Sequence, residues 1–188
     1  MRRPAAALIA AVGLAAAACG ASAQSRDYAA GVCSEIAAWV DTVNSSLAEL
    51  GENVSERTTV QQEVEAVGRH LDDVEAATAE LIAGLQDVPT AEVEGAEALS
   101  ARLVALLEET RTVTEEIRQE VQGLEDQGLA EFRQKVGPLL GRRIGVLVRR
   151  LLAAPTDPSA GEIAEGFQEE PSCDEVLSPV QQDTDPGT

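Results

Sequence analysis

Aromatic side chains are almost missing from this chain of 188 residues, which has only Tyr28, Trp39, Phe132 and Phe167. Basic residues are also scarce, because 14 Lys and Arg stand against 33 Asp and Glu and give a formal net charge of −19. Proteins that bind nucleic acids need a basic surface, and those that bind single strands also use stacking aromatics. The composition therefore argues against DNA or RNA as a partner.

Residues and motifs that carry chemistry are scarce as well. His70 is the only histidine, and Val67 stands where a Glu-x-x-His metal-binding pair would need its glutamate. The chain has neither a Gly-x-Ser-x-Gly turn nor a glycine-rich phosphate loop. We therefore expect no catalytic residue, no metal and no cofactor, and we interpret His70 as a surface or boundary residue of a non-enzymatic protein.

A long apolar run from Ala5 to Ala18 follows Arg2 and Arg3 at the start of the sequence. This order is typical of a secretory signal, and the run is too short to span a bilayer as a helix. The run ends at Ala16-Ala17-Ala18-Cys19, which resembles the lipobox of bacterial lipoproteins. The resemblance implies that residues 1–18 are removed, that the thiol of Cys19 is lipidated, and that residues 19–26 are a spacer on the outer face of a membrane.

A second cleavage site stays open beside the lipobox. Ala21-Ser22-Ala23 before Gln24 fits the A-x-A pattern of ordinary signal peptidase, and cleavage there predicts a secreted protein. The lipobox is favoured because the apolar run stops at Cys19. Either site leaves Cys33 and Cys173 in an oxidising compartment, where we expect them to form a disulfide.

The spacing of apolar residues predicts an all-helical protein. Most of them are Ala, Val and Leu, which suit closely packed helices better than a β-sandwich. We predict an antiparallel up-and-down four-helix bundle over residues 27–154, with helices at about residues 27–50, 55–86, 90–124 and 129–154.

The second and third helices carry apolar residues at alternating spacings of four and three, which is the pattern of a coiled-coil seam. Pro89 interrupts the chain between them, and so short a connection predicts an antiparallel, coiled-coil-like hairpin. Ser55 and Thr90 are the expected N-caps. Thr78 and Thr110 are polar residues in the seams, and we expect each hydroxyl to bond to its own helix.

The fourth helix combines a predicted break with an excess of positive charge. Pro138 should kink it or split it. Two interpretations of its arginines stay open, namely neutralisation by the acidic faces of the protein or contact with anionic lipid headgroups. The arginines concerned are Arg142, Arg143, Arg149 and Arg150.

Residues 155–188 form an acidic tail with five of the eight prolines, nine acidic residues and no basic one. We expect a short docked helix around Ile163 and Phe167 and disorder from about Ser178 onward. In an up-and-down bundle the end of the fourth helix lies beside the start of the first. The tail can therefore be tied back to the bundle through Cys173.

These features predict a non-enzymatic cell-envelope lipoprotein that acts as an interaction or scaffold module for another protein, with a homodimer left open. The alternative is a helical-bundle carrier of an apolar small molecule. A continuous, filled seam favours the scaffold. A cavity above about 300 Å³ favours the carrier.

Overall fold

The computed structural model describes residues 21–54, 59–90, 93–157 and 160–181, and every regular element within these ranges is a helix. The prediction of an all-helical protein is therefore confirmed. The elements are α1 (Ala23–Asn53), α2 (Val60–Asp87), α3 (Ala96–Gln122), α4 (Leu129–Pro138), the π-helix η1 (Leu139–Ile144), α5 (Gly145–Ala153), α6 (Glu162–Glu169) and α7 (Pro171–Gln181).

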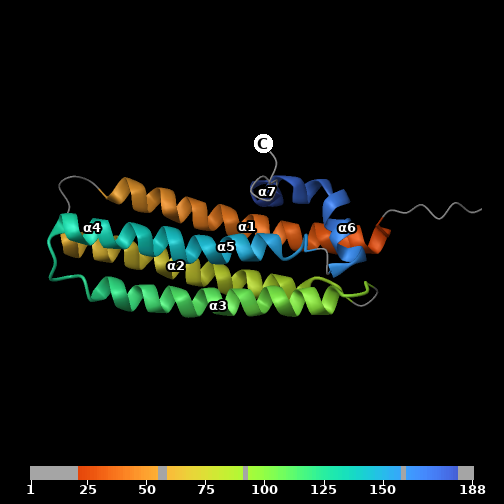
Figure 1. Ribbon diagram of the computed structural model, residues 1–188, viewed down its shortest axis with the longest axis horizontal. Coiled ribbons are helices and arrows are strands. Elements are labelled where there is room, and N and C mark those ends of the chain that lie inside the picture. Colours follow the sequence, from red (N-terminus) through yellow and green to blue (C-terminus); the bar gives the residue numbers. More distant parts are fainter. Residues whose placement is uncertain (1–20, 55–58, 91–92, 158–159, 182–188) are drawn as a thin grey trace, which may run out of the picture.

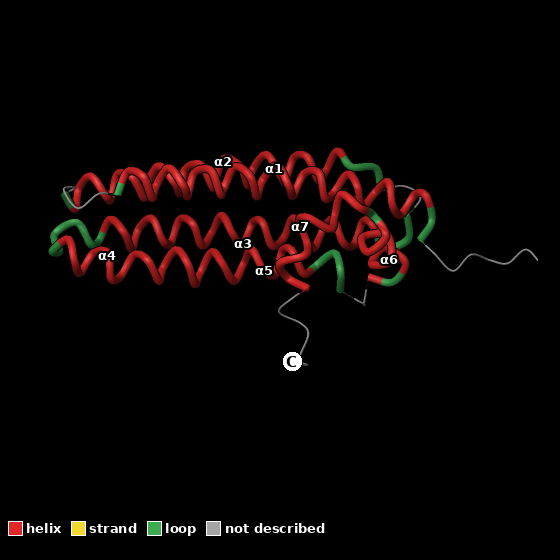
Figure 2. The backbone as a smooth tube through the Cα atoms, turned by 90° about the horizontal axis from the view of Figure 1, so that it is seen from above, coloured by secondary structure: helices red, strands yellow, loops and turns green. Residues whose placement is uncertain are grey.

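The long elements lie side by side along one axis. Figures 1 and 2 show α1, α2, α3 and the continuous rod of α4, η1 and α5, with successive rods running in opposite directions. α1 packs on α2, α2 packs on α3, and α3 packs on η1 and α5. The short helices α6 and α7 pack on α1, and α7 also contacts α5. α7 therefore lies across part of the surface where α1 and the fourth rod are neighbours.

Capping side chains determine where the first two helices begin. α1 begins at Ala23, four residues earlier than expected, because the side chain of Ser22 accepts a hydrogen bond from the backbone N–H of Ser25 at 3.1 Å. α2 begins at Val60 behind a reciprocal capping box formed by Thr59 and Gln62. The expected N-cap of α2, Ser55, lies outside the described residues, and its assignment as the cap was wrong.

The start of α3 also differs from the prediction. Val88 leaves helical geometry before Pro89, as expected, with φ −70° and ψ 123°. Thr90, however, does not cap α3, because its carbonyl accepts a bond from Val93 N in a separate turn. The helix starts only after Gly95, whose φ of 83° is a left-handed conformation that favours glycine.

The fourth rod changes its helical geometry at the predicted proline but stays continuous. α4 ends at Pro138, and the next six residues form η1 before α-helical geometry returns at Gly145. Proline has no N–H to donate within a helix, which explains why the regular bonding pattern changes beside it. Single π-helical turns inside longer helices are frequent at functional sites.

The acidic tail is more ordered than expected. Ile163 and Phe167 are fully buried on α6, which confirms the docked helix. α7 continues to Gln181, so the prediction of disorder from Ser178 was wrong for the first four of those residues. The physical reason is that Cys173 and Leu177 are buried against α1 and the core, and this burial outweighs the low hydropathy of the segment.

The predicted seam between α2 and α3 is filled. On α2 the seam residues from Val64 to Leu85 are buried. On α3 the seam residues from Leu99 to Ile117 are also buried, except for Val113, which is half-buried. Glu120, where the apolar pattern drifts, is exposed. The apolar rows of α2 and α3 are therefore used inside the protein.

Candidate functional site

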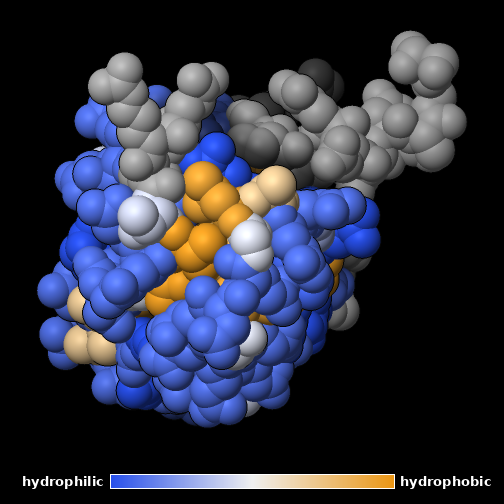
Figure 3. Space-filling model, turned by 90° about the vertical axis from the view of Figure 1, so that its left-hand side faces the viewer, coloured by the Kyte–Doolittle hydropathy of each residue, from blue (hydrophilic) through white to orange (hydrophobic). Residues whose placement is uncertain are grey.

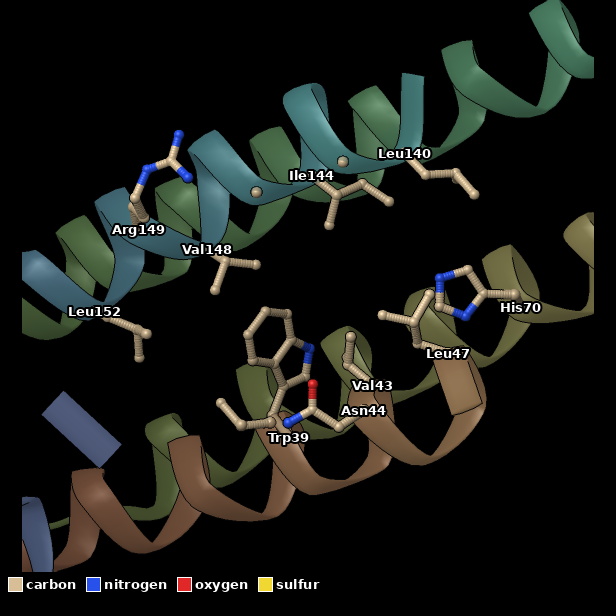
Figure 4. A pocket seen from close by; sticks show the side chains of 13 residues that line it. Trp39, Val43, Asn44, Leu47, His70, Leu140, Ile144, Val148, Arg149 and Leu152 are labelled. Atoms are coloured by element: carbon tan, nitrogen blue, oxygen red, sulfur yellow. The ribbon is translucent and has the colours of Figure 1, made fainter. Parts of the chain in front are cut away.

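An apolar groove runs along the side of the bundle between α1 and the η1–α5 part of the fourth rod (Figure 4). Its volume is about 430 Å³. Seen from the end where α1 ends and α4 begins, the molecule shows apolar surface between hydrophilic rims (Figure 3). The residues that line the groove are Trp39, Val40, Val43, Asn44, Leu47, His70, Leu140, Gly141, Ile144, Gly145, Val148, Arg149 and Leu152.

The groove exists because part of the apolar stripe of α1 has no covering helix. Ile36 and Trp39 are buried, as their spacing predicts, but Val43 is only half-buried and Leu47 is 50% exposed. Across the gap, η1 and α5 contribute side chains at one-turn intervals. Gly141 and Gly145 present no side chain to this surface. The sequence predicted an inward stripe of five residues, and the fold leaves two of them uncovered.

Trp39 forms a fixed part of the α1 wall. Its indole Nε1–H donates to Thr78 Oγ1 at 3.2 Å, and that hydroxyl donates to the carbonyl of Val74 at 2.6 Å. Thr110 makes the same kind of bond within α3, to the carbonyl of Leu106 at 2.9 Å. Both threonines thus bond to their own helices, as expected. Thr78 in addition holds the only tryptophan of the chain against the groove.

His70 lies between α2 and the groove and is only 4% exposed, so its interpretation as a surface or boundary residue was wrong. Ser46 Oγ lies 3.0 Å from His70 Nδ1 and donates to Asp73 Oδ2 at 2.7 Å. Because Ser46 has one hydroxyl proton, which it gives to Asp73, Nδ1 must be the donor. Nε2 is then a hydrogen-bond acceptor, and the imidazole points toward the groove (Figure 4).

Burial lowers the pKa of His70, while the negative charge of Asp73 opposes this shift. The ring is therefore neutral at physiological pH. The three side chains do not form a Ser-His-Asp relay, because the serine proton goes to the carboxylate and the histidine does not lie between the other two. No group of three metal-binding side chains occurs in the described part of the chain.

The sequence carries a signal for this cluster in the spacing of Ser46 and His70. Ser46 stands three residues after Val43 and four before Leu50, and His70 stands three after Val67 and four before Val74. Both residues therefore share the inward faces of their helices. Only the fold shows that these two faces meet.

The four arginines of the basic segment divide into two pairs. Arg143 pairs with Glu116 and Glu120 of α3, and Arg150 pairs with Glu109 at 2.7 Å. Arg142 and Arg149 make no ion pair with any part of the chain that the structure describes. Of these last two, only Arg149 lines the groove.

The predicted cysteine pair lies on α1 and α7. A disulfide joins Cys33 to Cys173, with the Cα atoms 5.2 Å apart. Cys19, the predicted lipidation site, lies outside the described residues. None of the described helices combines the length and the apolar character that crossing a membrane requires.

The fold and the site define a class rather than a family: a disulfide-linked helical bundle with an open apolar groove. No known family model matches this chain, and no curated protein or solved structure matches it. Its function must therefore be argued from the groove itself.

Proposed function

We propose that this protein is a non-enzymatic binding protein that holds an apolar small molecule in the groove between α1 and η1–α5. The observation that carries this proposal is the volume of the groove, about 430 Å³, together with the exposure of Leu47 at its mouth. The volume lies within the range of small-molecule sites, about 300–1,000 Å³. Apolar surface that stays wet is unfavourable by roughly 25 cal/mol per Å², so a ligand that covers it gains free energy.

A neutral apolar dye tests this proposal. Nile red should bind the purified protein saturably, and Leu47→Glu should weaken binding because it puts a carboxylate at the groove mouth. Val146→Glu is the matched control, since Val146 is 45% exposed but does not line the groove. Equal loss in both variants, or no saturable binding, would contradict the proposal.

A role as an interaction module is the second candidate, and the filled α2–α3 seam supports it. We infer an antiparallel up-and-down four-helix bundle in which α2 and α3 form a coiled-coil-like arm. The acidic outer face of this arm suits a basic partner protein. The buried seam has no apolar row left for a homodimer, so a shared seam between two copies is disfavoured.

We further propose that Cys19 is lipidated and anchors the protein to the outer face of a bacterial membrane. Cleavage after Ala23 would remove Ser22, the N-cap of α1, and Ala21, which is 8% exposed. Loss of such a cap costs about 1 kcal/mol. Cleavage before Cys19 keeps both residues, and this supports the lipobox.

Membrane fractionation tests the anchor. Cys19→Ala should release the protein from the membrane fraction, because no thiol then remains to be lipidated. Unchanged fractionation would contradict lipidation of Cys19.

A further inference from the structure

The groove is long and narrow. On the fourth rod its lining extends from Leu140 to Leu152, which corresponds to about 18 Å at 1.5 Å per residue. On α1 it extends from Trp39 to Leu47, or about 12 Å. A volume of about 430 Å³ spread over this length accommodates one extended chain rather than a broad ring system or two chains.

Among the residues that the structure describes, Arg149 is the positive charge at the lip of the groove. The side chain of Arg149 packs along its own rod next to Gly145. Its Nη1 lies 3.7 Å from the position that a Cβ atom would take on that glycine. Arg149 has no ion-pair partner in the described ranges, although the chain has a net charge of −19 and neighbouring Arg143 and Arg150 are both paired. Its guanidinium is free to bind an anion at the edge of the apolar surface.

His70, the other polar side chain that points toward the groove, determines the orientation of a ligand. His70 presents Nε2 as an acceptor to the same groove, so it repels a carboxylate and does not bind it. An anionic group is therefore favoured at Arg149 on the lip. The remaining lining is apolar apart from Asn44 at the rim.

We propose that the groove binds a single-chain anionic amphiphile, a long-chain fatty acid, with its carboxylate on Arg149 and its alkyl chain against Val148, Ile144 and Leu140. This inference rests on the proposed binding function and names its ligand class. Charge complementarity at the lip selects the acid, and the length and volume of the groove select one chain.

Palmitate is the probe, and the fluorescence of Trp39 is the readout, because this tryptophan is the only one in the chain and lines the groove. Palmitate should bind saturably to the purified protein. Arg149→Gln should weaken its binding about tenfold, the loss of one charge-assisted hydrogen bond. Arg142→Gln is the matched control, since Arg142 is also exposed and unpaired among the described residues but lies outside the groove, and it should leave the affinity unchanged.

Hexadecanol separates this inference from the proposed function. It has the same chain without the charge, so it should bind more weakly than palmitate and respond to neither arginine variant. If hexadecanol binds as tightly as palmitate, or if both variants lose palmitate equally, the fatty-acid assignment is wrong while the apolar groove stands. If neither chain binds saturably, the proposed function fails as well.

A lipid surface is the competing source of an anionic headgroup. Phosphatidylglycerol vesicles should bind the unlipidated protein equally well whether or not palmitate fills the groove. Vesicle binding that is lost equally in Arg142→Gln and Arg149→Gln, without saturable palmitate binding, would overturn the proposal and favour headgroup contact.

Discussion

Polar atoms on single side chains determine how the apolar interior of this protein is organised. Trp39, Thr78 and Val74 form a chain of two hydrogen bonds, and Tyr28 OH donates to the carbonyl of Ala96 at 3.2 Å. Each of these three buried donors has a partner, which is the condition under which burial of a polar group is tolerated. These bonds tie α1 to α2 and α1 to α3 at fixed positions.

Thr78→Val should destabilise the protein by about 1–3 kcal/mol, because it leaves the indole N–H of Trp39 buried without an acceptor. Urea unfolding followed by circular dichroism measures the change. Thr110→Val is the matched control, since the hydroxyl of Thr110 bonds only within its own helix, and it should cost clearly less. Equal costs would show that the bond to Trp39 contributes nothing.

Tyr28 should resist deprotonation. Burial raises the pKa of its hydroxyl to about 12, from an ordinary value of 10.0. Because the folded state holds this proton more tightly, the contribution to stability is fully present below pH 10 and is lost as the pH rises toward 12. Tyr28 is the only tyrosine, so phenolate absorbance reports on it alone, and its midpoint should fall to about 10 in urea.

At the scale of the element, helix interiors follow from apolar periodicity, whereas helix ends depend on particular side chains. The periodicity predicted every long helix and also α6. It did not distinguish Ser55 from Thr59 as the cap of α2, or Thr90 from Gly95 before α3, because several residues near each end are acceptable caps. The choice depends on which residue completes a capping box or accepts a left-handed conformation.

The first turn of α2 is joined to α4 by an ion pair between a buried carboxylate and a partly exposed guanidinium. Glu63 is 2% exposed, and its Oε1 accepts from Arg133 Nε at 2.8 Å. Arg133→Gln should lower the free energy of unfolding by about 1–3 kcal/mol, because a buried carboxylate loses a charged donor. Arg142→Gln, at an exposed position without an ion pair in the described residues, should change it by less than about 0.5 kcal/mol in the same urea titration.

At the scale of the whole molecule, one covalent bond determines which part of the α1 face is covered. The disulfide from Cys33 to Cys173 joins residues 140 positions apart and holds α7 against α1. α7 covers the α1–α5 side near the disulfide, and the groove occupies the part of this side that α7 leaves open. The tail and the groove are therefore two parts of the same surface.

Loss of this disulfide should destabilise the protein by roughly 4–5 kcal/mol in the chain-entropy treatment of a loop of this length, and by less if the unfolded chain is compact. The double variant Cys33→Ala/Cys173→Ala tests this by thermal unfolding. Thiol titration of the denatured, unreduced protein should find neither Cys33 nor Cys173 free. Free thiols at these positions would contradict the bridge.

The sequence by itself determined the class of structure and the pairing of its cysteines. Small aliphatic residues at spacings of three and four fit helices, and two cysteines behind a sequence typical of a secretory signal predict a disulfide, because both are local or compositional properties. Only the tertiary structure decided that Val43 and Leu47 stay uncovered and that His70 is buried against Ser46. Periodicity shows which face of a helix is apolar, but which neighbour covers that face depends on how far α7 reaches along it.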